Sequence, residues 1–138
     1  MTRTPRAPAL VALLFAAAAL SACARPTPTP TPTAPATPSV PQGAQVFLEV
    51  TGPTCASCHT IEGLPGADGV VGPELTHIGT VAGTRVPGLS AEEYIRQSIQ
   101  QPGAFVVEGF PDVMPPGLRD QMSDEQFEAL VQYLLSLR

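Results

Sequence analysis

Lysine is absent from this chain of 138 residues, and so is tryptophan. All seven basic residues are arginines, and three of them precede the first acidic residue, Glu49. The stretch 42–138 therefore holds four arginines and all twelve acidic residues, which gives it a formal charge of −8. A surface of this sign repels phosphate groups, so the composition argues against nucleic acid as a partner.

The sequence also lacks a hydrophobic run long enough to span a membrane. Its longest run, residues 9–20, has 12 residues, whereas a spanning helix needs about 20. Arg3 and Arg6 precede this run, as basic residues precede the apolar part of a secretory signal. We therefore expect residues 1–22 to be a signal peptide, with a short N-terminal membrane anchor as the alternative.

The residues Leu20-Ser21-Ala22-Cys23 resemble the lipobox of bacterial lipoproteins. In such proteins the chain is cut before the cysteine, which is then lipidated, and more than one acyl chain anchors a protein stably. Of the three cysteines two are close together, so lipidation also accounts for the odd one, Cys23. We expect an exported protein held by this lipid on the outer, periplasmic face of the cytoplasmic membrane. An ordinary cysteine near the end of a signal peptide is the alternative.

The segment that follows Cys23 is rich in proline and threonine. Residues 24–41 contain seven prolines, which fix φ in the polyproline II range and build no packed core. At about 3.1 Å per residue such a spacer reaches roughly 50 Å. We expect residues 23–41 to be the lipidated cysteine with a disordered linker, and residues 42–138 to be one folded domain.

Helical patterns occur at both ends of this domain and near its middle. An apolar pattern with period 3.6 favours a helix over residues 41–51, which Gly52-Pro53 ends. The sequences Ser90-Ala-Glu-Glu93 and Ser123-Asp-Glu-Gln126 are capping boxes, which predict the starts of two further helices. The first of these should run to about Gln100, before Pro102-Gly103. The predicted fold class is all-α, with three to four helices.

Two long segments between the helices, residues 61–88 and 102–120, are rich in glycine and proline. Loops of this length without regular structure are uncommon in a compact domain. They are accounted for if they wrap a large apolar cofactor that forms part of the core.

The sequence Cys55-Ala-Ser-Cys58-His59 is the C-x-x-C-H pattern of covalent haem attachment. Two thiols three residues apart on one turn can reach both vinyl groups of one porphyrin, and the adjacent imidazole then lies under the iron. We therefore predict one covalent haem c, bound by Cys55, Cys58 and His59. The alternatives are a zinc site that adds His77 and a thioredoxin-like dithiol pair.

The second axial ligand of the iron is predicted to be Met114, which lies in a loop stiffened by Pro115 and Pro116. Met122 directly precedes a helix cap, and we interpret it as packing under the last helix. His77 is the competing ligand. Met1 is removed with the signal peptide.

With these residues the domain resembles a class I cytochrome c over its whole length. The resemblance implies that Gly43 and Phe47 form a helix contact crossed by Tyr133, and that the Pro73 carbonyl accepts a hydrogen bond from His59. The stretch from Gly72 to Pro115 is especially similar to cytochrome c domains of bacterial haem-copper oxidases. Mitochondrial-type members dock through a ring of lysines, and that mode does not transfer to a lysine-free chain.

The resemblance implies a membrane-tethered carrier of single electrons that is not itself an enzyme. Its expected donor is a quinol-oxidising complex or a dehydrogenase, and its acceptor an oxidase or a photo-oxidised centre. We expect a monomer or a subunit of a complex, docking through a basic partner surface or an apolar ring around the haem edge. A fixed haem subunit of a larger oxidoreductase is one alternative, and a haem peroxidase or gas-binding protein is another.

The lipobox is tested by the substitution Cys23→Ala. Without the thiol that accepts the acyl chains, the haem protein should remain uncleaved or be released in soluble form. Membrane fractionation and the mass of the mature chain measure this outcome. A variant that matures and partitions into membranes like the wild type would show that the lipobox hypothesis is wrong.

Overall fold

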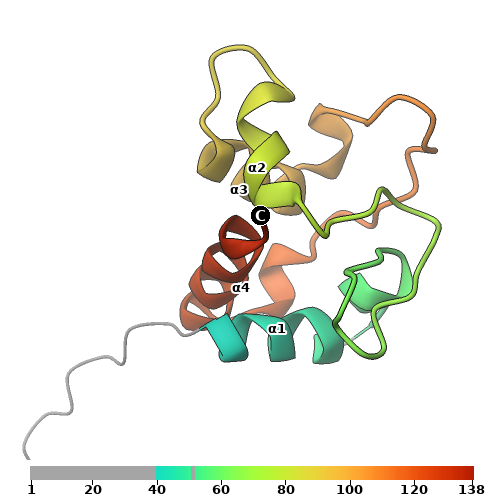
Figure 1. Ribbon diagram of the computed structural model, residues 1–138, viewed down its shortest axis with the longest axis vertical. Coiled ribbons are helices and arrows are strands. Elements are labelled where there is room, and N and C mark those ends of the chain that lie inside the picture. Colours follow the sequence, from blue (N-terminus) through green and yellow to red (C-terminus); the bar gives the residue numbers. More distant parts are fainter. Residues whose placement is uncertain (1–39, 51) are drawn as a thin grey trace, which may run out of the picture. The chain divides into compact units, whose positions relative to one another are not determined.

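The computed structural model describes residues 40–50 and 52–138 of the chain. This part contains four α-helices and four short 3₁₀ turns, joined by irregular segments (Figure 1). Within these residues the only β-type pairing is one isolated bridge between Thr60 and Asp68. The all-α prediction with three to four helices is thus confirmed. In chain order the elements are α1 (Val40–Glu49), η1 (Cys55–Ser57), α2 (Ile78–Val81), η2 (Ala82–Thr84), α3 (Ala91–Gln100), η3 (Pro102–Ala104), η4 (Arg119–Gln121) and α4 (Asp124–Ser136).

Both predicted capping boxes start helices. At α3 the Ser90 hydroxyl accepts a hydrogen bond from the backbone N–H of Glu93, and the Glu93 carboxylate accepts one from the backbone N–H of Ser90 at 2.8 Å. Ser123 and Gln126 make the same reciprocal pair at α4. Because each box satisfies two N–H groups that have no partner within the helix, the starts of both helices are fixed by local sequence.

Helices α1 and α4 pack closely against each other, and Figure 1 shows α1 lying beside one end of α4. At the contact, a side chain on Gly43 would collide with the Ala129 carbonyl and the Tyr133 Cβ. The fully buried Phe47 meets the Tyr133 ring edge-on, with 6.4 Å between ring centroids and 66° between planes. The helix contact expected from Gly43, Phe47 and Tyr133 is therefore present.

The boundaries of α1 differ from those expected, and α2 was not foreseen. Helix α1 begins at Val40 and ends at Glu49 rather than running through residue 51, with Pro41 at an early position where its missing N–H costs nothing. The four-residue α2 lies within a segment expected to be irregular. A hydrogen bond from the last residue of the chain helps to hold α2 in place: the Arg138 guanidinium donates to the Gly79 carbonyl at 2.6 Å.

The two long segments between helices keep little regular structure, as expected. They hold most of the positive-φ glycines of the described part of the chain, and hydrogen bonds between nearby backbone groups form turns within them.

No helix among the described residues has the length and apolar character needed to cross a membrane.

The close approach of α1 and α4 is tested by Gly43→Ala. The added methyl should raise helix propensity by up to about 1 kcal/mol. It must also displace the backbone of α4, and overpacking of this kind costs about 1–3 kcal/mol. We expect a net loss of roughly 1–2 kcal/mol in the free energy of unfolding, measured by urea denaturation of the haem-loaded protein.

Gly83→Ala is the matched control, because a Cβ at Gly83 would have its nearest contact at 3.4 Å, from the Ala91 nitrogen. This control should leave the free energy of unfolding within about 0.5 kcal/mol of the wild type. Equal stabilities of the two variants would contradict the proposed tight crossing at Gly43.

Candidate functional site

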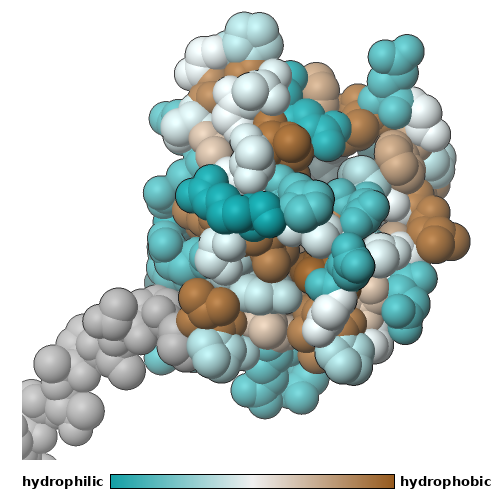
Figure 2. Space-filling view, in the orientation of Figure 1, coloured by the Kyte–Doolittle hydropathy of each residue, from teal (hydrophilic) through white to brown (hydrophobic). Residues whose placement is uncertain are grey.

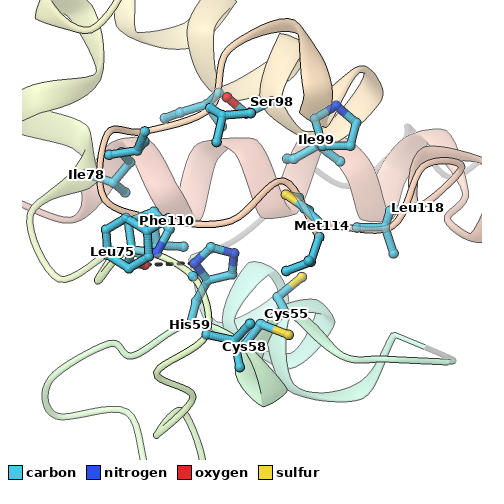
Figure 3. A pocket seen from close by; sticks show the side chains of 18 of the residues that line it. Cys55, Cys58, His59, Leu75, Ile78, Ser98, Ile99, Phe110, Met114 and Leu118 are labelled. Atoms are coloured by element: carbon cyan, nitrogen blue, oxygen red, sulfur yellow. Dashed lines mark hydrogen bonds between the residues drawn. The ribbon is translucent and has the colours of Figure 1, made fainter.

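The turn that carries the two thiols is held by its own hydrogen bonds. The Thr54 side chain caps η1 by accepting from the Ser57 N–H at 3.2 Å. The Cys55 carbonyl accepts from the N–H of Cys58 at 3.1 Å and from the N–H of His59 at 2.9 Å. Figure 3 shows the sulfurs of Cys55 and Cys58 and the His59 ring at one cavity. The local sequence therefore places two thiols and an imidazole together.

The His59 imidazole is oriented by the Pro73 carbonyl oxygen, 2.7 Å from its Nδ1. Because a carbonyl only accepts, Nδ1 carries the proton and Nε2 keeps an unprotonated lone pair. Burial lowers the pKa of His59, and the bond to Pro73 opposes this only in part. The ring is thus held as a neutral imidazole, which is the form that binds a metal.

Gly72 allows the loop of Pro73 to lie directly against His59. A side chain at Gly72 would collide with the Cε1 and Nδ1 atoms of the imidazole. The Gly72 N–H donates to the Cys58 carbonyl at 2.8 Å, and the Thr60 hydroxyl donates to the Gly69 carbonyl at 2.7 Å. These bonds join the loop to the thiol-bearing turn, so the position of Pro73 relative to His59 is set by two segments together.

Met114 reaches the same cavity from a different segment, the loop that follows α3. Its side chain is half-buried and lines the cavity, and Figure 3 shows it on the same side of the cavity as Leu118 and Ile99, facing Cys55. Inside this loop the Val113 N–H donates to the Pro111 carbonyl at 3.0 Å. Pro115 follows Met114 directly, which restricts the backbone at Met114.

The remaining walls of the cavity are largely apolar. The cavity holds about 1190 Å³ of empty space, part of it open to solvent. Protein interiors are close-packed, so an apolar space of this size next to two thiols and an imidazole fits a large planar apolar group such as a haem. Apolar wall residues from the helices and their flanks include Phe47, Ile78, Ile95, Ile99, Leu118, Leu130 and Leu134.

Arg85, the residue after η2, also lines the cavity, and sequence reasoning did not find it. Its guanidinium makes no hydrogen bond or ion pair with any other described residue. The other arginines of the folded part are engaged: Arg96 with Glu128 and Glu92, Arg119 with Asp124, and Arg138 with Gly79. Arg85 is thus a cation available to an anionic group in the cavity. The sequence offers no signal for this, since η2 was not predicted.

The thioredoxin-like alternative finds no support in the two thiols. Both are free and half-buried, and burial raises the pKa of Cys55 to about 11. A dithiol redox pair works through a thiolate with a lowered pKa. At neutral pH the Cys55 thiol is instead protonated.

The other candidate ligands lie elsewhere. His77 is exposed at the start of α2 and Met122 is buried in the core, and neither lines the cavity. In the described ranges no group of three or more His, Cys, Asp or Glu side chains is placed to hold a metal ion, so the zinc alternative lacks its ligand set. The structure thus brings Cys55, Cys58, His59 and Met114 to one cavity, with Pro73 behind the imidazole. Cys23 lies outside the described residues.

Comparison with known proteins gives a family. The family model for cytochrome c matches residues 40–138. No curated protein sequence matches the chain.

Several solved structures are similar to this chain, and two of them are the following. The c-type cytochrome SorU from Sinorhizobium meliloti has a TM-score of 0.42 and 23% sequence identity, over 71% of this chain and 88% of that chain. SoxXA from P. pantotrophus has a TM-score of 0.48 and 20% identity, over 75% of this chain and 84% of that chain.

The family match and the lining of the cavity both indicate a haem protein. Cys55 and Cys58 stand in the C-x-x-C-H arrangement of the family, at a cavity whose lining fits a haem. The match covers most of the chain, including every described residue of the cavity wall. The chain therefore belongs to the cytochrome c family, whose members bind a c-type haem with iron covalently and transfer electrons.

Proposed function

We propose that this protein is a membrane-tethered one-electron carrier whose haem iron is held between His59 and Met114. The observation that carries the proposal is that both side chains line the cavity of Cys55 and Cys58 and come from separate loops. In this arrangement Cys55 and Cys58 would form the thioethers, His59 would ligate through Nε2, and Met114 would ligate through sulfur. The bound haem supplies reversible one-electron chemistry at iron.

Ligation by both residues suits a carrier rather than a catalyst. If His59 and Met114 both held the iron, no coordination position would stay open for a substrate. A thioether opposite an imidazole raises the reduction potential. The apolar walls act in the same direction, because they disfavour the more positive ferric state.

The Pro73 carbonyl acts on the site through His59. By accepting the Nδ1 proton at 2.7 Å it fixes the orientation of the ring and makes Nε2 a stronger donor. Gly72 keeps the carbonyl at this distance by leaving room for the ring. The protein thereby keeps the ligand in place while the charge of the iron changes.

The proposals for the membrane tether and for the redox partners rest on the sequence alone. Lipidation at Cys23 and export to the periplasmic face would hold the domain near membrane complexes. A linker of residues 24–39, which ends where α1 begins at Val40, would let the domain reach roughly 50 Å. We propose a quinol-oxidising complex or a dehydrogenase as donor. The likeness of the segment from Gly72 to Pro115 to oxidase-associated domains favours a haem-copper oxidase as acceptor, with a photo-oxidised centre as the other candidate.

Two other functions remain distinguishable by experiment. A fixed subunit of a larger oxidoreductase would co-purify with its partners after extraction in mild detergent, whereas a mobile carrier would not. A haem peroxidase or gas-binding protein would need an open iron, so the ferrous form would bind CO at neutral pH.

The ligand assignment is tested by Met114→Ala, with Met122→Ala as control. Loss of the thioether at Met114 should abolish the sulfur-to-iron charge-transfer band, lower the reduction potential and open the ferrous iron to CO. Met122 is buried in the core away from the cavity. Its truncation should therefore cost about 2–5 kcal/mol of stability and leave the spectrum unchanged. Absorption spectra and a redox titration measure both variants.

A Met114→Ala variant with the wild-type spectrum and potential would contradict the assignment. If the band disappeared instead in Met122→Ala, the ligand would be Met122. Met114→His should keep the iron closed to CO but lower the potential, since imidazole does not favour ferrous iron as a thioether does.

Arg85 is expected to pair with a carboxylate of the haem. A cation near the iron disfavours the ferric state, so Arg85→Gln should lower the reduction potential by about 20–60 mV, where 59 mV is tenfold for one electron. Arg138→Gln makes the same change of charge outside the cavity and should shift the potential by much less. Redox titration measures both variants. Equal shifts of the reduction potential in the two would contradict a role for Arg85 at the haem site.

A further inference from the structure

Most of the exposed large hydrophobic side chains of the described residues belong to the loops that border the cavity. Five large hydrophobic residues are exposed among the described ones, and all are valines. Four of them, Val70 (85% exposed), Val71 (45%), Val106 (39%) and Val113 (56%), belong to the two loops that border the cavity; we call them the valine rim. The fifth, Val40 (46%), starts α1.

The valine rim is continuous with the site. Val71, Val106 and Val113 line the cavity as well as reaching the surface, and Val70 adjoins Val71. In Figure 2 hydrophobic residues reach the surface on the right-hand side, where Figure 1 draws the green and orange loops. Clustered exposed apolar residues mark interaction sites, whereas single ones are ordinary.

The charges beside the valine rim are of one sign. Its two loops, residues 60–76 and 101–118, contain no arginine or lysine. They carry four exposed acidic residues next to or near the rim in sequence, which we call the acidic border: Asp68, Glu74, Glu108 and Asp112.

The arginines of the domain do not neutralise this border. Arg96, Arg119 and Arg138 are bound to other partners, Arg96 to Glu128 at 2.5 Å. Arg85 is half-buried in the cavity wall. A surface that meets the valine rim therefore also meets uncompensated negative charge.

We propose that the valine rim and the acidic border form the docking surface for a redox protein whose contact face is apolar at its centre and bordered by lysine or arginine. This inference rests on the proposed carrier function and names the partner of that site. Apolar contact at the centre gives the complex its lifetime, and complementary charge at the border speeds the encounter. A second copy of this chain or an anionic membrane would bring like charges together. Docking here also places the partner at the mouth of the haem cavity.

The test uses a probe of this chemistry, a mitochondrial-type cytochrome c with lysines around its apolar haem edge. The same probe with acetylated lysines keeps the apolar edge and loses the positive charge. The haem-loaded full chain, in neutral detergent, is mixed with either probe. Stopped-flow absorbance follows the transfer of one electron from the ferrous haem of one protein to the ferric haem of the other. NMR titration of the ¹⁵N-labelled chain follows binding independently of electron transfer.

Each test variant has a matched control with the same substitution. Val70→Ser removes the most exposed rim residue, which does not line the cavity, and Val40→Ser is its control on α1. Glu108→Gln removes one charge of the border, and Glu49→Gln is its control on α1. All four side chains are exposed.

We expect Val70→Ser to slow electron transfer about three- to tenfold with both probes, because the complex would lose part of the apolar contact of a buried valine. Glu108→Gln should slow it about two- to fivefold at low ionic strength with the native probe alone. The native probe should react about tenfold faster than the acetylated probe. Amide shifts should concentrate at residues 70–72 and 106–113, and neither control should differ from the wild type.

Four results would overturn the proposal: Val70→Ser behaving like Val40→Ser, the acetylated probe reacting as fast as the native one, a dimer in sedimentation that Val70→Ser dissociates, or vesicle binding that depends on Val70. The dimer would assign the valine rim to a second copy, and the vesicle result would assign it to the membrane. Failure of the carrier function itself would appear separately, in the spectrum and potential of the wild type, because each rate is compared between proteins with the same haem site.

Discussion

The hydrogen bond from His59 to the Pro73 carbonyl joins the two segments on which the site depends. One segment is the turn of η1, which carries the thiols, and the other is the loop that Gly72 brings against the imidazole. The bond fixes which nitrogen of His59 is protonated, and it leaves the lone pair of Nε2 available to bind a metal. Burial lowers the pKa of the same ring and keeps it neutral. Without this bond the cavity would still have apolar walls but no oriented ligand.

The fold around this bond has two parts with different requirements. Helices α1 and α4 pack directly on each other, because Gly43 permits close approach and Phe47 and Tyr133 fill the contact. The loop after α3, by contrast, faces the cavity through Met114 and has few backbone hydrogen bonds of its own. We infer that α1 and α4 form the frame of the domain, while the bound haem completes the core against which the loop packs.

The sequence predicted those features that are encoded locally. Both capping boxes and the turn with Cys55 and Cys58 follow from residues within a few positions of each other, and the structure contains all of them. The proximity of His59, Pro73 and Met114 is not local. Met114 was predicted from the haem-attachment motif and from its proline-flanked loop, whereas the role of Pro73 was predicted only from the resemblance to a family.

Features without a short-range signal were missed. Helix α2 has four residues and no side-chain cap, and it is held in part by a bond from the distant Arg138. The position of Arg85 follows from η2, which was also missed. The collision that forbids a side chain at Gly72 is a contact across thirteen positions of sequence, with the ring of His59. Such contacts are set by packing, which periodicity and propensity do not describe.

The central claim, that His59 and Met114 hold the iron, is tested most directly by NMR of the ferrous protein with ¹³C-labelled methionine methyl groups. A methyl group bonded to a sulfur on the iron lies over the haem and is shifted far upfield by its ring current. The account predicts one such methyl resonance, present in Met122→Leu and absent in Met114→Leu. A spectrum without any shifted methyl, or one whose shifted methyl disappears in Met122→Leu, would contradict it.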